Sequence, residues 1–273
     1  MSALARRHLA ALLLLCSFGL QAATPPAQDA SQLYIDTTPA LDVDYVPTPM
    51  PTVRKMLEMA EAGPEDHLVD LGSGDGRILV TAARKYGVRS ALGIELDPWL
   101  VEYARAEAME AGVSDRVKFV QADLFETDFA NADVVTMYLL PQLNLRLRPY
   151  MLARLSPGTR IVSHSFDMGE WQPDARAEMY KKPIFMWIVP AQVSGTWEVE
   201  LNREGPPIVL TLRQEFQHLE GSASLAGQAV QLDELTLSGR DIRFRIGDDV
   251  FEGRVDGRTM QSTGTLPWFA MSR

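Results

Sequence analysis

The chain has 273 residues, a formal net charge of −10 at pH 7 and a hydrophobic content of 46%. This length predicts one large domain or two smaller ones, and the hydrophobic content is sufficient for a folded core. The acidic balance argues against general binding to nucleic acids or anionic membranes, because both attract basic surfaces.

Residues 1–23 have the pattern of a secretory signal peptide. Arg6 and Arg7 precede an apolar run that ends at Leu20, and two alanines follow shortly after it. The apolar run is too short for a comfortable membrane span, and no later segment is apolar enough for one. The only cysteine, Cys16, lies within this segment. We therefore predict a secreted or periplasmic protein with no stable membrane span, no disulfide and no cysteine-based metal site after signal removal.

A folded domain is predicted to follow a flexible leader. Residues 24–44 are rich in Ala, Pro, Gln, Asp and Thr, which is typical of a segment without a fixed structure. A Pro-Thr-Pro turn at residues 47–49 then opens a helix over residues 51–62, which a Gly-Pro pair closes.

Residues 65–76 predict a buried strand followed by a glycine-rich loop and a helix. The strand, residues 67–71, is a short apolar run that carries Asp70. The loop consists of Gly72, Ser73, Gly74, Asp75 and Gly76. Such a unit brings backbone amides and a helix N-terminus against a ligand, because glycine lets the backbone approach where a Cβ would collide. A glycine loop alone is weak evidence, since it also occurs in ordinary strand-to-helix turns.

The next two strands each end in an acidic side chain. Residues 90–98 predict the second strand, with Glu95 at its carboxyl end, about 25 residues after Asp70, where an acid binds a ribose diol. Residues 117–123 predict a third strand that ends at Asp123. Ligands of open α/β sheets sit at these carboxyl ends, so the acids belong to one predicted site.

This series of strand ends resembles the class I S-adenosylmethionine-dependent methyltransferases over about residues 40–190. The resemblance implies a Rossmann-like seven-stranded sheet and S-adenosylmethionine as the cofactor. It also implies that the glycine loop packs against the methionine and ribose part and that Asp70 steadies this loop. Glu95 would hold the ribose hydroxyls, and Asp123 would address the adenine amino group. The positions taken as cofactor-binding in this stretch are Asp70, Gly72, Ser73, Gly74, Glu95 and Asp123. A dinucleotide site fits less well, because the loop reads Gly-x-Gly-x-Gly instead of Gly-x-Gly-x-x-Gly.

A narrower resemblance concerns the lysine methyltransferases of this class. A Pro-Thr-Pro segment, a helix with Met-Leu, and then Asp-Leu-Gly-Ser-Gly-Asp-Gly is similar to the mitochondrial family that acts on inner-membrane proteins. It is more distantly similar to the non-SET histone methyltransferase. In that group the segment before the first helix helps to close the cofactor site, which implies that Tyr45 and Thr48 lie near it.

The predicted acceptor side follows the fourth strand, residues 132–138. Residues 139–144 form the loop at its carboxyl end, where an acceptor nucleophile would meet the methyl group. Tyr138 and Gln142 are the candidate polar side chains there, although a tyrosine can equally well pack a strand end. Enzymes that methylate amino groups of nucleic acids carry Asn/Asp-Pro-Pro-Tyr/Phe at this point. This chain has Tyr-Leu-Leu-Pro-Gln, which argues against a nucleic-acid substrate.

The remaining elements complete a domain that spans residues 45–190. A helix over residues 149–155, a fifth strand over residues 159–166 and a hairpin within residues 175–189 are predicted. His164 near the end of the fifth strand is either a base or a structural histidine.

Residues 195–273 change pattern and predict a small antiparallel β module. Alternating runs occur at residues 196–201, 208–213, 242–246 and 250–255, with turn signals between them. No cluster of chemistry-bearing residues is present, so a docking or capping element is favoured over a second active site.

The leading functional hypothesis is protein-lysine N-methylation. The alternatives are methylation of a small molecule or lipid-like acceptor, and a catalytically silent protein that binds S-adenosylmethionine. The export signal conflicts with the cytosolic supply of this cofactor. An uncleaved anchor that leaves the domain inside the cell, or an exported domain that has lost its chemistry, would remove the conflict.

Overall fold

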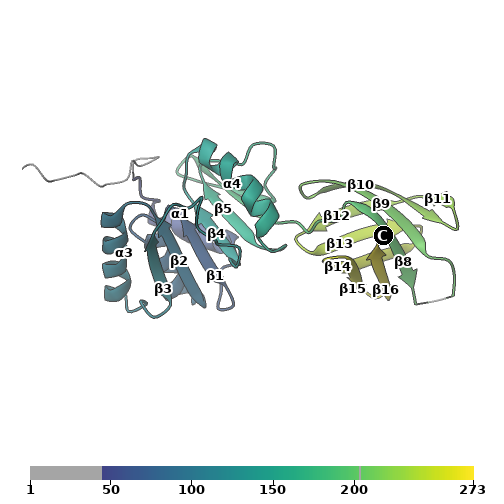
Figure 1. Cartoon of the computed structure of the whole chain (residues 1–273), viewed down its shortest axis with the longest axis horizontal. Helices are drawn as coiled ribbons and strands as arrows, with labels where there is room; N and C mark the ends of the chain where they lie inside the picture. The colour runs from purple at the N-terminus through teal and green to yellow at the C-terminus, as the bar shows by residue number, and fades with distance from the viewer. Residues whose placement is uncertain (1–44, 203) are drawn as a thin grey trace, which may run out of the picture. The chain divides into compact units, whose positions relative to one another are not determined.

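The computed structural model describes residues 45–202 and 204–273, which form two separate β-sheets. The predicted signal peptide (1–23) and leader (24–44) lie outside the described residues. The first sheet has seven strands in the order β3-β2-β1-β4-β5-β7-β6 (Figure 1). Its elements are α1 (Met50–Met59), β1 (His67–Leu71), α2 (Arg77–Thr81), the π-helical turn η2 (Ala82–Tyr86), β2 (Ser90–Glu95), α3 (Pro98–Glu110), β3 (Val117–Gln121), β4 (Val134–Met137), α4 (Pro141–Arg154), β5 (Arg160–His164), β6 (Ala175–Met179) and β7 (Lys182–Ile188).

Strands β1 to β5 pair in parallel, and β7 pairs antiparallel with both β5 and β6. The parallel strands therefore end at one common edge of the sheet, where a ligand site is expected. The predicted seven-stranded methyltransferase sheet and its terminal hairpin are confirmed.

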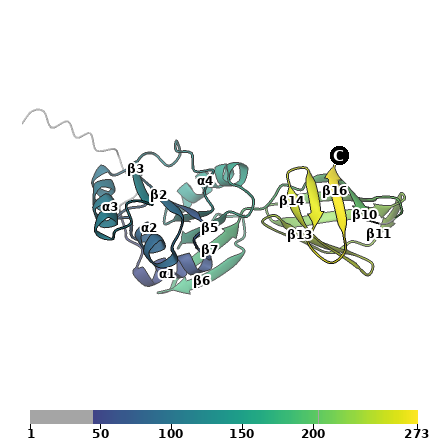
Figure 2. The same ribbon diagram turned by 90° about the horizontal axis from the view of Figure 1, so that it is seen from below.

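Different helices cover the two faces of this sheet (Figure 2). In β1, Leu68 belongs to a buried cluster with residues of α1, α2 and α3, whereas Val69 and Leu71 belong to a cluster with residues of α4. Successive residues of a strand point to opposite faces, so a strand buried on both faces reads as a continuous apolar run. That run is the signal from which β1 was predicted.

Local sequence signals explain where α3 begins. Pro98 occupies the first helical turn, where its missing N–H costs nothing. The Asp97 carboxylate caps the helix by accepting a hydrogen bond of 2.8 Å from the backbone N–H of Trp99.

Helix α4 begins earlier than predicted. The expected helix started at Pro149, but α4 runs from Pro141 and contains Pro149 in its interior. Both prolines suit a first helical turn, and the sequence alone favoured the second one. The buried side chains of α4 at Leu143, Leu147 and Met151 recur every four residues and pack against the sheet, which selects the longer helix.

The second sheet has nine antiparallel strands in the order β11-β10-β9-β8-β16-β15-β14-β13-β12 (Figure 1). Its strands are β8 (Gly195–Leu201), β9 (Ile208–Glu215), β10 (His218–Leu225), β11 (Gln228–Val230), β12 (Asp233–Ser238), β13 (Asp241–Ile246), β14 (Asp249–Asp256), β15 (Thr259–Ser262) and β16 (Trp268–Ser272). The predicted antiparallel β module is confirmed, and the four predicted runs correspond to β8, β9, β13 and β14.

Aromatic side chains form the centre of the module core. The Phe244 and Phe251 rings stack with centroids 4.6 Å apart, and Trp268 meets both rings edge-on. Gly253 makes room for this indole, because a Cβ at position 253 would come within 2.4 Å of the Trp268 ring. No helix within residues 45–202 or 204–273 is long and apolar enough to cross a membrane.

The turn between β9 and β10 contacts the methyltransferase sheet. The Phe216 ring stacks on the buried Trp171 ring with centroids 6.0 Å apart. Trp171 Nε1 donates a hydrogen bond of 3.0 Å to Gln217 Oε1, and Gln217 Nε2 donates one of 2.8 Å to the Gln172 carbonyl. The module thus covers one aromatic side chain of the first domain.

These contacts indicate how the methyltransferase domain would behave without the module. We expect a chain that stops at Val193 to bind cofactor with unchanged affinity but to unfold more easily. Exposure of part of the Trp171 surface should cost about 1.5–3 kcal/mol of unfolding free energy. Calorimetric titration and thermal unfolding of the truncated chain measure the two effects. The matched control is Phe216→Ala in the full chain, which should reproduce part of the destabilisation. Loss of cooperative unfolding in the truncated chain would show instead that the two sheets share one core.

Candidate functional site

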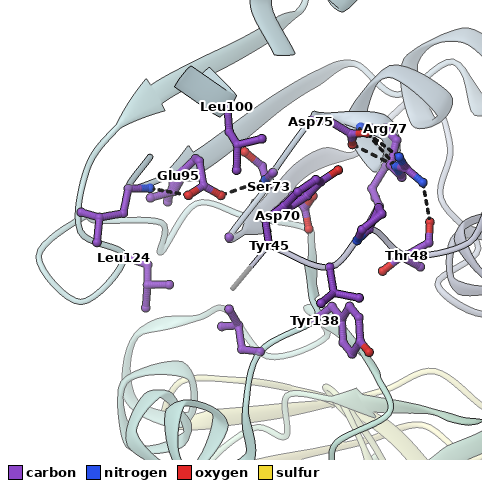
Figure 3. Close-up of a pocket in the computed structure, with 18 of the residues that line it drawn as sticks. Tyr45, Thr48, Asp70, Ser73, Asp75, Arg77, Glu95, Leu100, Leu124 and Tyr138 are labelled. Atoms are coloured by element: carbon purple, nitrogen blue, oxygen red, sulfur yellow. Dashed lines mark hydrogen bonds and ion pairs between the residues drawn. The ribbon is translucent and has the colours of Figure 1, made fainter. Parts of the chain in front are cut away.

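A pocket lies at the carboxyl ends of β1, β2, β3 and β4, where parallel strands of an open sheet bind ligands (Figure 3). It has an empty volume of about 940 Å³, part of it open to solvent. All eight residues predicted to bind the cofactor line this pocket, as does Tyr138. They are Tyr45, Thr48, Asp70, Gly72, Ser73, Gly74, Glu95 and Asp123. The structure thus brings together side chains that are up to 78 positions apart in the sequence (45 to 123).

Glu95 organises the backbone around the glycine loop. Its Oε2 accepts a hydrogen bond of 2.9 Å from the backbone N–H of Gly74. Its Oε1 accepts bonds of 2.8 and 3.0 Å from the N–H groups of Leu96 and Asp97. A carboxylate that accepts three amide bonds is held in one orientation, with lone pairs left for a further donor such as a ribose hydroxyl.

Asp70 lines the pocket, and its side-chain hydrogen bond goes to a neighbouring strand. It lies at the end of β1 and accepts a hydrogen bond of 2.7 Å from Thr136 Oγ1 on the neighbouring strand β4. The expected contact with the glycine loop is made by Glu95 instead. Burial raises the pKa of Asp70 to about 8, and the Thr136 hydroxyl offsets only part of this rise. The charge of Glu95 contributes to this rise, and the Asp70 carboxyl is therefore mostly protonated near pH 7.

Residues 45–49, here called the N-terminal strap, lie against the glycine loop. The Tyr45 ring fills the space beside Gly74, because a Cβ at Gly74 would lie 2.4 Å from Tyr45 Cε2. Arg77 Nη1 donates a hydrogen bond of 3.1 Å to the Thr48 carbonyl, and the Arg77 guanidinium also pairs with Asp75. Burial and a hydrogen bond to Asp75 raise the pKa of Tyr45 to about 12. The strap is therefore held both by Arg77, in the first turn of α2, and by the glycine loop.

Two further residues predicted to bind the cofactor line the pocket, one within the glycine loop and one after the end of β3. Asp123 Oδ1 accepts a hydrogen bond of 2.8 Å from the backbone N–H of Phe125, which orients this carboxylate at the pocket. Ser73 is buried, and its hydroxyl has no hydrogen-bond partner within the described residues.

Tyr138 marks the acceptor side of the pocket. In Figure 3 Tyr138 and Glu95 lie on opposite sides of the cavity. The Tyr138 hydroxyl accepts a hydrogen bond of 2.9 Å from Lys182 Nζ, and its ring lies 4.1 Å from that of His164. Nδ1 of His164 lies 3.2 Å from Thr48 Oγ1 on the strap. Burial and the Lys182 charge lower the pKa of His164 to about 4, so the imidazole is neutral near pH 7.

Gln142, the second predicted acceptor-side residue, is not part of this lining. It is exposed in the first turn of α4, while Leu139 and Leu143 face the cavity. The reason is the early start of α4, which turns the predicted loop into helix and places Gln142 on its solvent side. The sequence also missed Asp75, Arg77 and Lys182 as members of the site. Asp75 and Arg77 follow the loop glycines directly, so the motif itself contained a signal for them.

The residues of the pocket fit S-adenosylmethionine, whose sulfonium and α-ammonium are cationic. Four acidic side chains line the cavity, and Arg77 is the one basic side chain among the described lining residues; it is already paired with Asp75. The lining acids are Asp70, Asp75, Glu95 and Asp123. A buried carboxyl with a raised pKa is stabilised in its charged form by a nearby cation, so this donor set suits a positively charged ligand. Within the described residues, no group of His, Cys, Asp and Glu has the arrangement of a metal site.

Because of Asp70, we expect cofactor binding near pH 7 to release roughly one proton per site. In the free protein the pKa of Asp70 is about 8, and a bound cation should lower it, so the ionised form predominates in the complex. Affinity should then rise by up to about tenfold per pH unit below pH 8 and level off above it. Calorimetric titration in buffers of different ionisation enthalpy measures the proton count. Asp70→Asn should reduce it to near zero, and an unchanged count in that variant would contradict the assignment.

Comparisons with known proteins agree with this site. A family model described as the ANTKMT methyltransferase domain matches residues 70–175. A protein-lysine N-methyltransferase of Saccharolobus islandicus (strain REY15A) is 44% identical over 131 residues, which cover 48% of this chain and 81% of that protein. The adenine nucleotide translocase lysine N-methyltransferase of Mus musculus is 34% identical over 168 residues, covering 62% of this chain and 67% of that protein.

One solved structure is similar in both sequence and fold. It is the crystal structure of an RNA methyltransferase from Salinibacter ruber in complex with S-adenosyl-L-homocysteine. It has 52% sequence identity and a TM-score of 0.53, and the match covers 54% of this chain and 96% of that one. S-adenosyl-L-homocysteine is the demethylated product of S-adenosylmethionine, and the similar structure binds it. Together with the acidic pocket described above, this confirms S-adenosylmethionine as the cofactor.

The matched region of these relatives, residues 70–175 in the family model, contains the glycine loop, Glu95, Asp123 and Tyr138. The individual roles of these side chains stay predictions. Because a protein-lysine N-methyltransferase is matched over four fifths of its length, this chain belongs to the family of class I S-adenosylmethionine-dependent protein-lysine N-methyltransferases.

Proposed function

We propose that this enzyme methylates the ε-amine of a lysine in a protein of the membrane fraction, and that the lysine enters past Tyr138. The observation that carries the proposal is the contact of Tyr138 with an ammonium group of the chain itself. Lys182 Nζ lies 2.9 Å from the Tyr138 hydroxyl and 5.5 Å from its ring centroid. The acceptor side of the pocket thus offers a lysine amine both a hydrogen-bond acceptor and an aromatic face.

The chemistry requires the chain to position and desolvate two reactants. When bound, S-adenosylmethionine supplies a methyl group made electrophilic by its sulfonium. Glu95 and the glycine loop would hold the cofactor on one side, and the N-terminal strap would exclude water from it. On the other side, Tyr138 and the neutral His164 carry no positive charge, whereas the adjacent Lys182 does. Burial among these residues and the Lys182 charge both lower the pKa of an entering amine. The amine loses its proton to solvent before it can act as a nucleophile.

The membrane-fraction part of the proposal rests on the relatives. The mouse relative is named for adenine nucleotide translocase, and this chain covers 67% of its length. From that name we infer only the class of acceptor for this chain, which is a lysine of a membrane protein.

RNA is the second candidate substrate, because the solved structure with 52% identity is titled as an RNA methyltransferase. Two features of this chain argue against it. The net charge is −10, whereas RNA-binding surfaces are basic. The segment after β4 reads Tyr-Leu-Leu-Pro-Gln, without the Asn/Asp-Pro-Pro-Tyr/Phe motif of nucleic-acid amino methylation.

The test is methyl transfer from labelled S-adenosylmethionine to separated cell fractions. We expect label in the membrane-protein fraction, sensitive to protease and resistant to ribonuclease, and recovered as methyl-lysine after acid hydrolysis. The Glu95→Ala variant serves as the control for contaminating activities. Label that is lost with ribonuclease would replace the proposal by the RNA alternative, and label in small molecules alone would also overturn it.

We further propose that the N-terminal segment exports the enzyme, so that it works outside the cytosol. The support is the run of two arginines, an apolar core and two alanines within residues 1–23. Residues 1–30 fused to a reporter that is active only after export should give an active reporter. An inactive fusion would contradict export, and cytosolic S-adenosylmethionine would then reach the domain without difficulty.

A further inference from the structure

We propose that Lys182 is a self-methylation site, at which each chain methylates its own side chain. The proposal rests on lysine methylation as the reaction of this site. It adds a modification site within the enzyme, at a lysine that contacts Tyr138 beside the acceptor side of the pocket.

The topology places Lys182 at the catalytic edge of the sheet. Lys182 is the first residue of β7, and β7 runs antiparallel to β5 with His164 opposite Ile184. The start of β7 therefore lies beside the carboxyl end of β5, at the same edge where β4 ends and Tyr138 follows. Among the described residues, no other lysine makes a hydrogen bond or ring contact with a residue that lines the pocket.

The Lys182 ammonium makes the two contacts that a substrate lysine would need at this edge. It donates to the Tyr138 hydroxyl and lies over the Tyr138 ring at 5.5 Å. Its charge also contributes to the lowered pKa of His164, which places it close to the imidazole as well. One tyrosine side chain thus separates Lys182 Nζ from the cavity that Tyr138 lines.

Nothing else in the described structure holds Lys182 in place. No carboxylate of residues 45–202 or 204–273 forms an ion pair with it, and its side chain is exposed. Four rotatable bonds carry the amine, so Nζ can change its position without any change in the backbone.

The reaction is a direct methyl transfer. The lone pair of the neutral Lys182 amine forms the new N–C bond while the C–S bond of the sulfonium breaks. The sulfur keeps the bonding electron pair and leaves as uncharged S-adenosylhomocysteine. The new methylammonium carries the positive charge and loses a proton to water before a second transfer. No further reactant is needed.

The composition makes this site easy to isolate. The chain has only five lysines against 21 arginines. The five lysines are Lys55, Lys85, Lys118, Lys181 and Lys182. Lys181 precedes the site directly and is also exposed, and it makes no hydrogen bond or ring contact with Tyr138 in the described structure, so it is the matched internal control.

The first experiment incubates the purified full chain with S-adenosylmethionine and no other substrate, and maps added methyl groups by fragmentation mass spectrometry. We expect mass increments on Lys182 and none on Lys181. Lys182→Arg should abolish the labelling, whereas Lys181→Arg should leave it unchanged. A Glu95→Ala chain with a mass tag, mixed with the wild type at a cofactor concentration too low for the variant to bind, should stay unlabelled, because transfer occurs within one chain. Equal labelling of the tagged chain, or equal labelling of Lys181, would overturn the proposal.

A second experiment tests the contact itself without cofactor. Each lysine is labelled with a limiting amount of an amine-reactive reagent, and the extent is compared between the wild type and Tyr138→Phe. Loss of the Tyr138 hydroxyl should raise the labelling rate of Lys182 about two- to fivefold, because an exposed polar contact contributes at most about 1 kcal/mol. The rate at Lys181 should not change. An unchanged rate at Lys182 would contradict the geometry on which the proposal stands.

The two proposals fail in different ways. An enzyme that methylates membrane-fraction lysines but leaves Lys182 unmodified would refute self-methylation and keep the proposed function. An enzyme that modifies neither, while still binding S-adenosylhomocysteine, would refute both.

Discussion

Glu95→Ala should weaken the binding of S-adenosylmethionine by roughly ten- to a hundredfold, because a carboxylate that accepts hydrogen bonds contributes about 1.5–3 kcal/mol. Two losses combine in this variant. The expected bonds to the ribose hydroxyls disappear, and the N–H groups of Gly74, Leu96 and Asp97 lose their acceptor. The glycine loop would then no longer be tied to the end of β2. Calorimetric titration with S-adenosylmethionine and with its demethylated product measures the effect.

Glu95→Gln separates the two losses. The glutamine carbonyl can still accept from the backbone, but the amide cannot accept a second set of hydrogen bonds. We expect this variant to bind more tightly than Glu95→Ala and more weakly than the wild type. Unfolding should be measured in parallel, so that a change in affinity is not confused with loss of the fold. If Glu95→Ala binds the cofactor as well as the wild type does, the ribose role of Glu95 is wrong even though the fold is right.

Gly74→Val should have the largest effect and should raise the dissociation constant of the cofactor by at least about a hundredfold. From the sequence, the expected reason for this loss of binding is that the valine fills space that the cofactor needs. The structure gives a different first cause. A Cβ at position 74 would lie 2.4 Å from Tyr45 Cε2, so the valine first displaces the Tyr45 ring and with it the N-terminal strap. Gly74 also has a φ of +53°, which costs an L-residue roughly 1–2 kcal/mol and a β-branched one more.

Two further variants assign this effect to its causes. Gly87 has a φ of +69° and no atom within 4 Å of an added Cβ, so Gly87→Ala reports backbone strain alone. It should lower the unfolding free energy and leave cofactor affinity unchanged. In a Tyr45→Ala background, Gly74→Ala should cost less affinity than it does beside the native Tyr45, because the collision is absent. Equal costs in both backgrounds would show that Tyr45 does not mediate the effect of a side chain at position 74.

The elements of the first sheet were predictable because their signals are local. A strand buried on both faces is a continuous apolar run, as in β1, and the acids Glu95 and Asp123 mark the ends of their strands regardless of what surrounds them. The β module was harder to predict. Strand β10, for example, has the sequence HLEGSASL with most of its residues exposed, so it shows no clear alternation of apolar and polar residues. Its position is set by pairing with β9 along its whole length.

The sequence by itself determined the fold class, the cofactor and most of the side chains that line the pocket, since these follow from motifs at the ends of the strands. Only the tertiary structure decided which contacts these side chains make. Glu95 rather than Asp70 holds the glycine loop, Tyr45 occupies the space beside Gly74, and Lys182 meets Tyr138. Each of these contacts joins residues that are more than 20 positions apart, and their geometry depends on strand order and on rotamers. Neither the strand order nor the rotamers can be predicted from residue spacing in the sequence, because both are set when the sheet packs.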